Sequence, residues 1–309
     1  MSARNDIFQN ILQAKNNAQD LLRRDYLRNL YEHTNRDTII YATAFASKKL
    51  PQIPPYLVSI TNEDIQGFIS ALEDIDGKYL DLIIHSPGGS SEVVDQIVQY
   101  LRSKYEHIRA IIPQNAMSAA TMLACAADVI VMGKHSAIGP IDPQITFPTQ
   151  NGHFTAPAQS IIDEFNRAKE EVTLNPKISP LWISKMKDFS PGLLTICDDT
   201  IANSIDKVAE WLSAYMLKDD DDRLNKSRSI AEWLGNAKEH RTHGRPIMKQ
   251  AAIDKGIIIE DLESDPIFQE RVMDVFHATM CTFDITNCMK FVENHTGKGY
   301  FVNVKIEKN

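Results

Sequence analysis

The sequence predicts an α/β fold built from consecutive parallel βαβ units. Three short apolar segments, each followed by a turn, alternate with two segments whose side chains suit helices that pack on a sheet. The strand candidates are residues 79–85, 108–112 and 129–132, and the helix candidates are residues 93–101 and 116–127. Short connections from strand to helix to strand imply parallel pairing with right-handed crossovers.

Further helices and strands are expected around this unit. Residues 5–33 carry apolar side chains among many charges, which predicts an amphipathic helical arm that caps the domain or a neighbouring subunit. Residues 146–156 contain helix and strand breakers and are expected to be irregular. Strands are also expected at 38–45 and 300–306, and helices at 159–173, 200–217 and 229–239.

The composition is that of an ordinary globular protein and argues against several classes. The 309 residues are 43% hydrophobic and 24% charged, which is enough to bury a sizeable core. The net charge of −8 argues against nucleic-acid binding, for which a basic surplus is typical. We find neither an apolar run near the roughly 18 residues of a membrane helix nor a signal-peptide pattern. The four cysteines fit neither a metal motif nor a disulfide framework, so we expect a cytoplasmic protein with reduced thiols and no membrane span.

Two turns that follow consecutive strands contain residues suited to acyl-transfer chemistry. The first is HSPGGSS at 85–91, where Gly88 and Gly89 let the backbone turn sharply and expose amide hydrogens. The second is QNAMSAAT at 114–121, which places Ser118 at the start of a helix of small residues. A helix start offers unpaired N–H groups and positive dipole character. Together the turns predict an oxyanion hole beside a hydroxyl nucleophile.

Each turn alone also has a simple structural interpretation. A glycine pair after a strand is commonly only a turn, and a serine near a helix N-terminus is more commonly a cap than a nucleophile. The functional interpretation depends on finding both turns in consecutive βαβ units, which is far more specific than either turn alone.

The motifs of residues 79–145 resemble those of the Clp-protease class of serine peptidases, which includes the proteolytic subunit of Clp and signal peptide peptidase A. The shared pattern appears here as IIHSPGGS, QNAMSAATMLACAADVIVM and SAIG. The segments GPIDPQI and HGRPIMKQAAIDKGI are most similar to the serine dehydrogenase proteinase family. With a looser resemblance over 36–265, we expect a helical arm at 1–35, a peptidase domain at 36–265 and a C-terminal extension at 266–309.

The resemblance implies a Clp-protease/crotonase-like fold of stacked right-handed βαβ units, with C-terminal helices that mediate assembly into a homo-oligomer. It assigns the nucleophile to Ser118, the oxyanion amides to Gly89 and Ala119, and a loop-shaping role to Gly88. The implied activity is hydrolysis of peptide bonds in a peptide or protein substrate. This chemistry needs no metal and no organic cofactor.

The general base is where this sequence departs from its relatives. Pro140 stands where the Clp subunit has a histidine, and Gln159, in TAPAQSI, stands where the signal-peptide-peptidase branch has a lysine. Glutamine cannot act as a general base, although it can orient a hydroxyl. The substitute candidates are Asp142, as a base or orienting carboxylate, and the loop histidines His135 and His153.

Three further hypotheses are open at this stage. His243, Gly244 and Arg245 form either an anion site or a helix-and-turn closure on the core, and the resemblance favours the closure. A chain that keeps the serine but lacks a base would be a catalytically impaired scaffold or binding protein. A crotonase-like acyl-CoA enzyme would also use two backbone amides as an oxyanion hole, although it would not need the serine.

Overall fold

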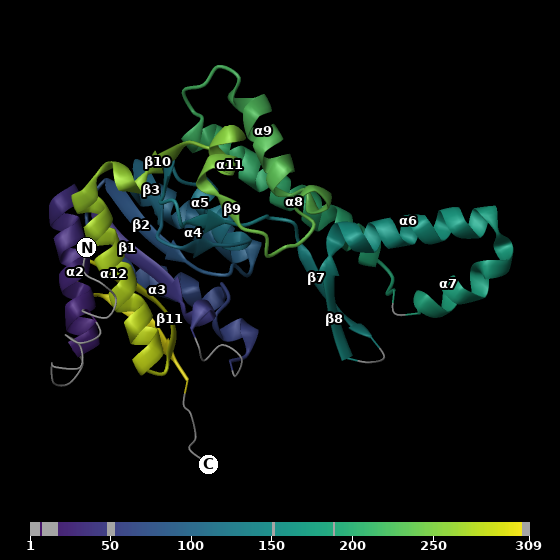
Figure 1. The fold of residues 1–309 in the computed structure, drawn as a ribbon, viewed down its shortest axis with the longest axis horizontal. Coiled ribbons are helices and arrows are strands. Elements are labelled where there is room, and N and C mark those ends of the chain that lie inside the picture. Colours follow the sequence, from purple (N-terminus) through teal and green to yellow (C-terminus); the bar gives the residue numbers. More distant parts are fainter. Residues whose placement is uncertain (1–6, 8–17, 48–52, 150–151, 188, 305–309) are drawn as a thin grey trace, which may run out of the picture.

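A seven-stranded, mostly parallel sheet forms the centre of the molecule (Figure 1). The computed structural model describes residues 7, 18–47, 53–149, 152–187 and 189–304. The spatial order of the strands is β10-β5-β3-β2-β1-β11-β12. The parallel strands are β1 (Asp37–Thr43), β2 (Tyr79–His85), β3 (His107–Ile112), β5 (Val129–Met132) and β10 (Ile259–Asp261), and the antiparallel ones are β11 (Cys288–Asn294) and β12 (Gly299–Asn303). The expected α/β fold is confirmed.

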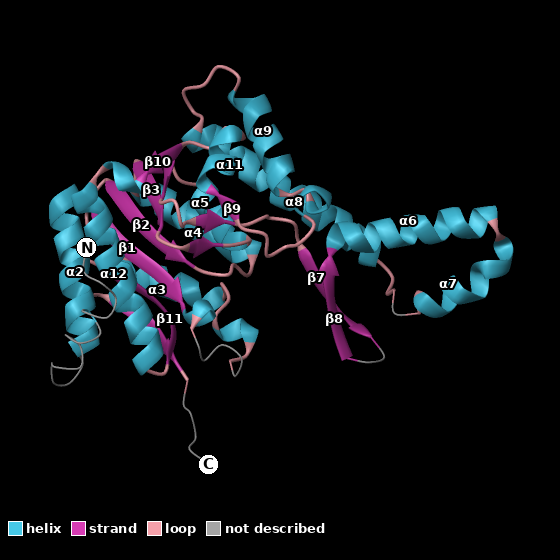
Figure 2. Cartoon of the chain, in the orientation of Figure 1, coloured by secondary structure: helices cyan, strands magenta, loops and turns pink. Residues whose placement is uncertain are grey.

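Helices cover both faces of the sheet because its strands carry apolar side chains in both directions (Figure 2). In β2, Leu82 and Ile84 pack on one face and Ile83 on the other. The first face is covered by α3 (Asn62–Ala71), α4 (Ser91–Lys104), α5 (Ala119–Cys125), α8 (Leu193–Trp211) and α9 (Arg223–Leu234). The second face is covered by α2 (Ala18–Thr34) and α12 (Pro266–Ile285).

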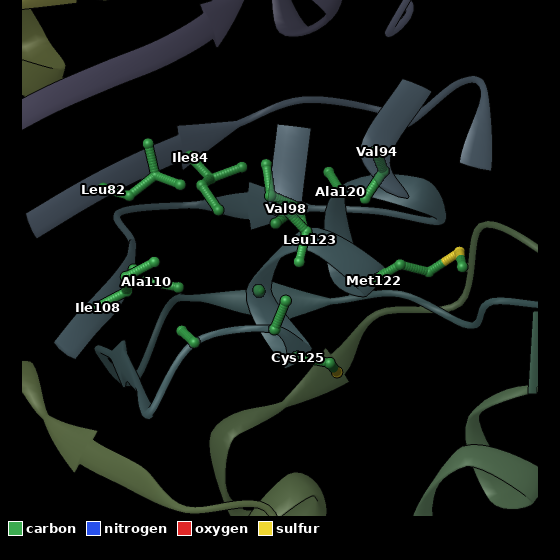
Figure 3. Packing of buried hydrophobic residues seen from close by; sticks show 14 of the residues in the cluster. Leu82, Ile84, Val94, Val98, Ile108, Ala110, Ala120, Met122, Leu123 and Cys125 are labelled. Atoms are coloured by element: carbon green, nitrogen blue, oxygen red, sulfur yellow. The ribbon is translucent and has the colours of Figure 1, made fainter. Parts of the chain in front are cut away.

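The small side chains of α5 allow this helix to lie deep in the core. Ala120 and Ala124 are fully buried, and Figure 3 places Ala120, Leu123 and Cys125 among side chains of β2, β3 and α4. The helix is shorter than expected because Asn115–Ala116 form the short strand β4, which pairs with β6 (Ala137–Ile138). The strand β9 (Ile247–Met248) completes this second, three-stranded sheet.

The expectation of irregular structure at 146–156 is wrong. Strands β7 (Gln144–Thr149) and β8 (Gly152–Pro157) form an antiparallel hairpin there. Side chains that face each other across the strands stabilise it, because Thr146 and Thr155 share a hydroxyl hydrogen bond of 2.8 Å and the rings of Phe147 and Phe154 are in contact.

The C-terminal part of the chain belongs to the same sheet as the motifs. Helix α12 packs against α2, and β11 pairs with β1. The boundary expected at 265 therefore crosses a continuous sheet and its covering helices. The N-terminal arm was expected to cap either its own domain or a neighbouring subunit. Its described helix α2 packs on its own chain, and residues 8–17 lie outside the described residues.

A helical arm projects from this body beside the β7–β8 hairpin (Figure 1). It consists of α6 (Ala158–Leu174) and α7 (Ser179–Lys185), and α8 leads back to the core. The helices α10 (Ala237–His240) and α11 (Lys249–Asp254) follow α9. Within the described ranges, we find no helix with both the length and the apolar character needed to cross a membrane.

Candidate active site

The two motif turns lie side by side at the carboxyl ends of β2 and β3. The Ser86 amide donates to the Asn115 carbonyl at 3.2 Å, and the Met117 amide donates to the Ser86 carbonyl at 3.0 Å. These bonds join the glycine turn to the turn that precedes α5. The carboxyl edge of a parallel sheet is the usual place for a ligand site in α/β folds.

Ser118 occupies a strained backbone position immediately before α5. Its φ is 53° and its ψ is −123°. Residues other than glycine rarely adopt this backbone conformation, and such strained residues cluster at functional sites. Its side chain makes no capping hydrogen bond to α5, so Ser118 does not have the structural role of a helix cap. Ser118 is half-buried and lines a cavity.

Gly88 allows the glycine turn to touch the serine turn. Its φ is +96°, and a Cβ at this position would lie 2.8 Å from the Ser118 Cβ and 2.6 Å from the Met117 carbonyl oxygen. Real side-chain atoms do not approach so closely. The contact therefore requires glycine for its size as well as for its backbone conformation.

Gly89 and Ala119 line the same cavity as Ser118. Ala119 is the first residue of α5, so its N–H has no acceptor within the helix. Gly89 has a φ of +152° and lies against the backbone of Ile60, which a Cβ would meet at 2.4 Å. The residues expected to supply the nucleophile and the oxyanion donors are therefore close together.

The cavity beside Ser118 has a volume of about 460 Å³ and mixed walls. Met122, Ile141 and Ile145 supply apolar surface, and Ser59 and Glu92 supply polar surface. Hydrogen bonds from its own backbone amide and from Ser90 hold the pKa of Glu92 below its usual value. Glu92 is therefore negatively charged at neutral pH.

A histidine and an aspartate meet at the edge of this cavity. His243 lines it, and the imidazole Nδ1 lies 2.9 Å from Asp142 Oδ1. The Asp142 side chain is almost fully buried, and its other oxygen accepts a 2.8 Å hydrogen bond from Gln144 Nε2. When Nδ1–H donates to the carboxylate, Nε2 is left unprotonated and able to accept a proton.

His243 is the residue that sequence reasoning missed. The sequence favours a closure on the core for the segment that contains His243. The structure shows in addition that the His243 side chain contacts Asp142, which lies 101 positions earlier in the chain. Helices α6 to α10 lie between the two residues in sequence, so no local spacing could connect them. The available signal was a histidine next to a glycine after a helix, which is common.

The other expected candidates lie elsewhere. Gln159 Nε2 donates to Asp163 Oδ1 at 2.8 Å in a neighbouring cavity that also contains Asp142 and His243. His135 is exposed after β5, and His153 is exposed on β8. Among the described residues that line the Ser118 cavity, these three are absent.

His85, which begins the glycine motif, is unsuited to be the base. The ring is fully buried between Phe45 and Phe276, with ring centroids 4.6 and 5.1 Å away. Burial lowers the pKa of His85 to about 3, so the imidazole is neutral across the physiological range.

The sequence and the fold are similar to those of known proteins. The sequence matches the family of ClpP-like SDH-type serine proteinases over residues 7–282. Two similar relatives come from Methanocaldococcus jannaschii. The uncharacterized protein MJ1495 is 36% identical over 148 residues, which cover 45% of this chain and 47% of the relative. The uncharacterized protein MJ0137 is 32% identical over 180 residues, which cover 56% and 60%.

The matched segments thus span about half the length of these relatives. Among solved structures, a variant of the 1510-N membrane-bound stomatin-specific protease aligns with a TM-score of 0.32 and 16% identity, over 65% of this chain and 75% of that one. The family match extends over nearly the whole described chain and confirms the resemblance found in the motifs. The chain therefore belongs to the ClpP-like SDH-type serine proteinase family.

Proposed function

We propose that the chain hydrolyses peptide bonds with Ser118 as nucleophile, His243 as general base and Asp142 as the carboxylate that orients the histidine. The observation that carries this proposal is the contact between His243 and buried Asp142 at the edge of the cavity that Ser118 lines. A nucleophile beside a base that a third group orients is the arrangement that activates a serine hydroxyl.

The reaction proceeds in two stages. Ser118 Oγ attacks the substrate carbonyl while its proton passes to His243 Nε2, and Asp142 stabilises the imidazolium. The amides of Gly89 and Ala119 donate to the oxyanion of the tetrahedral intermediate. His243 then protonates the leaving amine as the peptide C–N bond breaks. Water, deprotonated by His243, hydrolyses the acyl-enzyme and regenerates the Ser118 hydroxyl.

Assigning His243 as the base makes a peptidase more favourable than the two alternatives, an impaired scaffold and a crotonase-like acyl-CoA enzyme. The impaired scaffold was suggested by Gln159 and Pro140, but His243 and Asp142 offer a base that neither of those positions supplies. The test is hydrolysis of an unfolded protein, such as casein, and of acyl-CoA thioesters by the purified chain. Release of peptides supports the proposal. Thioester hydrolysis without peptide release would favour the crotonase-like alternative, and no turnover of either would favour the scaffold.

A methyl group at Gly88 should separate the two turns and strongly reduce activity. In Gly88→Ala the new Cβ would lie within 2.8 Å of Ser118 Cβ and Ala119 N, so the nucleophile and an oxyanion donor must move apart. We expect kcat to fall about 100-fold, because a displacement near 1 Å has that effect. Gly152→Ala is the matched control, since Gly152 also has a positive φ but open space around it. Equal kcat values in the two variants would contradict the assignment.

We also propose that the α6–α7 arm binds a second copy of this chain, because the resemblance in the motifs implies a homo-oligomer and the arm exposes apolar side chains away from the core. An apolar groove on the arm is lined by Phe165, Trp182 and Ile183 among others, and Leu181 is 73% exposed. Leu181→Asp with Ile183→Asp should reduce the oligomer measured by analytical ultracentrifugation. Leu224→Asp, at a site 71% exposed on α9, is the control. A monomeric wild type, or an oligomer that the paired change leaves intact, would contradict this.

A further inference from the structure

The glycine loop, residues 88–90, is held in place by the backbone of Ile60. The Ile60 amide donates to the Gly88 carbonyl at 2.8 Å, and the Ser90 amide donates to the Ile60 carbonyl at 3.1 Å. These two bonds flank Gly89, which packs so closely on Ile60 that a Cβ would lie 2.4 Å from its nitrogen and oxygen. The direction of the Gly89 N–H therefore depends on where Ile60 lies.

The residues on either side of Ile60 are in turn bound by one buried lysine. Lys290 Nζ donates to the Ser59 carbonyl at 3.1 Å and to Thr61 Oγ1 at 2.8 Å. Its third partner is Asp64 Oδ2 at 2.9 Å, so the three donors of the ammonium meet three acceptors. Asp64 Oδ2 also accepts the Thr61 amide at 2.7 Å. Lys290 thus fixes the ends of the three-residue segment 59–61.

The position of this lysine is costly for a purely structural contact. Its side chain is 1% exposed, and Asp64 is 3% exposed. Burial raises the pKa of the Asp64 carboxyl even though the ammonium and the Thr61 amide oppose that shift. Removing two charges from water is expensive, and apolar residues of similar volume commonly give equal stability at such sites. What apolar residues would not provide is directional bonds to Ser59 and Thr61.

We propose that Lys290 is a positioning residue of the active site, which fixes segment 59–61 so that this segment holds the glycine loop and its Gly89 amide. Lys290 is not among the described residues that line the Ser118 cavity; it bonds to Ser59, which does line it, and to Thr61, and it acts on the glycine loop through Ile60. The inference rests on the proposed function for its catalytic consequence. Under this proposal the chemistry also requires β11, the strand that carries Lys290. This strand lies beyond the domain boundary expected at residue 265.

The test compares Lys290→Met with Arg23→Met. Arg23 is a suitable control because it is also a buried cation bonded to β11: its Nε donates to Glu293 Oε2 at 2.6 Å. Glu293 keeps a second partner, Arg24, when Arg23 is replaced. Both changes remove a buried charge near β11, but only Lys290 is bonded to segment 59–61. We expect Lys290→Met to lower kcat about 10- to 100-fold with little change in KM, because the loss is one of transition-state positioning. Arg23→Met should keep the wild-type kcat.

Hydrogen exchange provides a readout that does not require turnover. In Lys290→Met, peptides that contain residues 59–61 and 88–90 should exchange faster than in wild type, and in Arg23→Met they should not. If Lys290→Met does not fold, Thr61→Val removes one of the three acceptors and should lower kcat roughly three- to tenfold. Folded Lys290→Met or Thr61→Val with the kcat and exchange of Arg23→Met would overturn the inference. An inactive wild type would refute the proposed function, and the exchange comparison would still decide whether Lys290 holds the loop.

Discussion

Replacing Ser118 with alanine should reduce peptide hydrolysis by roughly four to six orders of magnitude, as the loss of a serine nucleophile does in enzymes with this mechanism. The change removes only the hydroxyl, which makes no capping bond to α5. Alanine keeps the same Cβ in the same strained backbone position, so we expect the thermal unfolding midpoint to stay within a few degrees of wild type. The measurement is kcat/KM on a fluorogenic peptide, with unfolding followed by circular dichroism.

A cap or a purely structural serine would behave differently. Its loss would change stability and leave the turnover of the folded fraction intact. Ser136→Ala is a useful comparison, because the Ser136 hydroxyl accepts the Gly133 amide at 2.9 Å in a buried turn away from the cavity. That variant should lose stability and keep its kcat. Activity in Ser118→Ala above about one hundredth of wild type would exclude a nucleophilic role.

Replacing His243 with alanine should have an effect of similar size. Without the imidazole the ionisable side chain left among the described residues that line the cavity is Glu92, whose lowered pKa makes its carboxylate a weak base, and His85 is buried away from the cavity. Because nucleophile and base act as one unit, the double variant Ser118→Ala, His243→Ala should be no slower than either single variant. Two independent losses that multiply would indicate that His243 acts elsewhere.

Two neighbours of His243 sharpen this comparison. Asp142→Asn should lower kcat by about 10⁴-fold, because an amide that donates to Nδ1 favours the wrong tautomer. Gln159→Ala should have little effect, because Gln159 bonds to Asp163 and does not line the Ser118 cavity. For the same reason Gln159→Lys should not raise activity. A large loss in Gln159→Ala would instead favour the role that the family's lysine position implies.

The sequence predicts the framework of the site because that framework is local. The strand at 79–85 and the one at 129–132 match their expected bounds, since an apolar run that a glycine or proline ends specifies a buried strand. Ser118 and Gly88 lie in turns that such strands create. The hairpin β7–β8 was missed because Pro148 and Gly152 suggested a loop, although both are tolerated at the margins of a two-stranded ribbon.

The rest of the site depends on contacts that are distant in the sequence. His243 reaches Asp142 across 101 positions, and Lys290 reaches Asp64 across 226. Each of these partners looks ordinary in its own segment: a histidine in a loop, a lysine in a strand. Only the packing of α6 to α10 and the pairing of β11 with β1 bring them into position.

Reaction with a fluorophosphonate probe tests the shared role of Ser118 and His243 most directly. The probe forms a stable adduct only with a serine that a base activates, and mass spectrometry of the digested protein identifies the modified residue. We predict a single adduct on Ser118 in the wild type, no adduct in Ser118→Ala, and labelling slowed at least about 100-fold in His243→Ala. An adduct on another residue, or labelling of Ser118 at the wild-type rate in His243→Ala, would contradict the account.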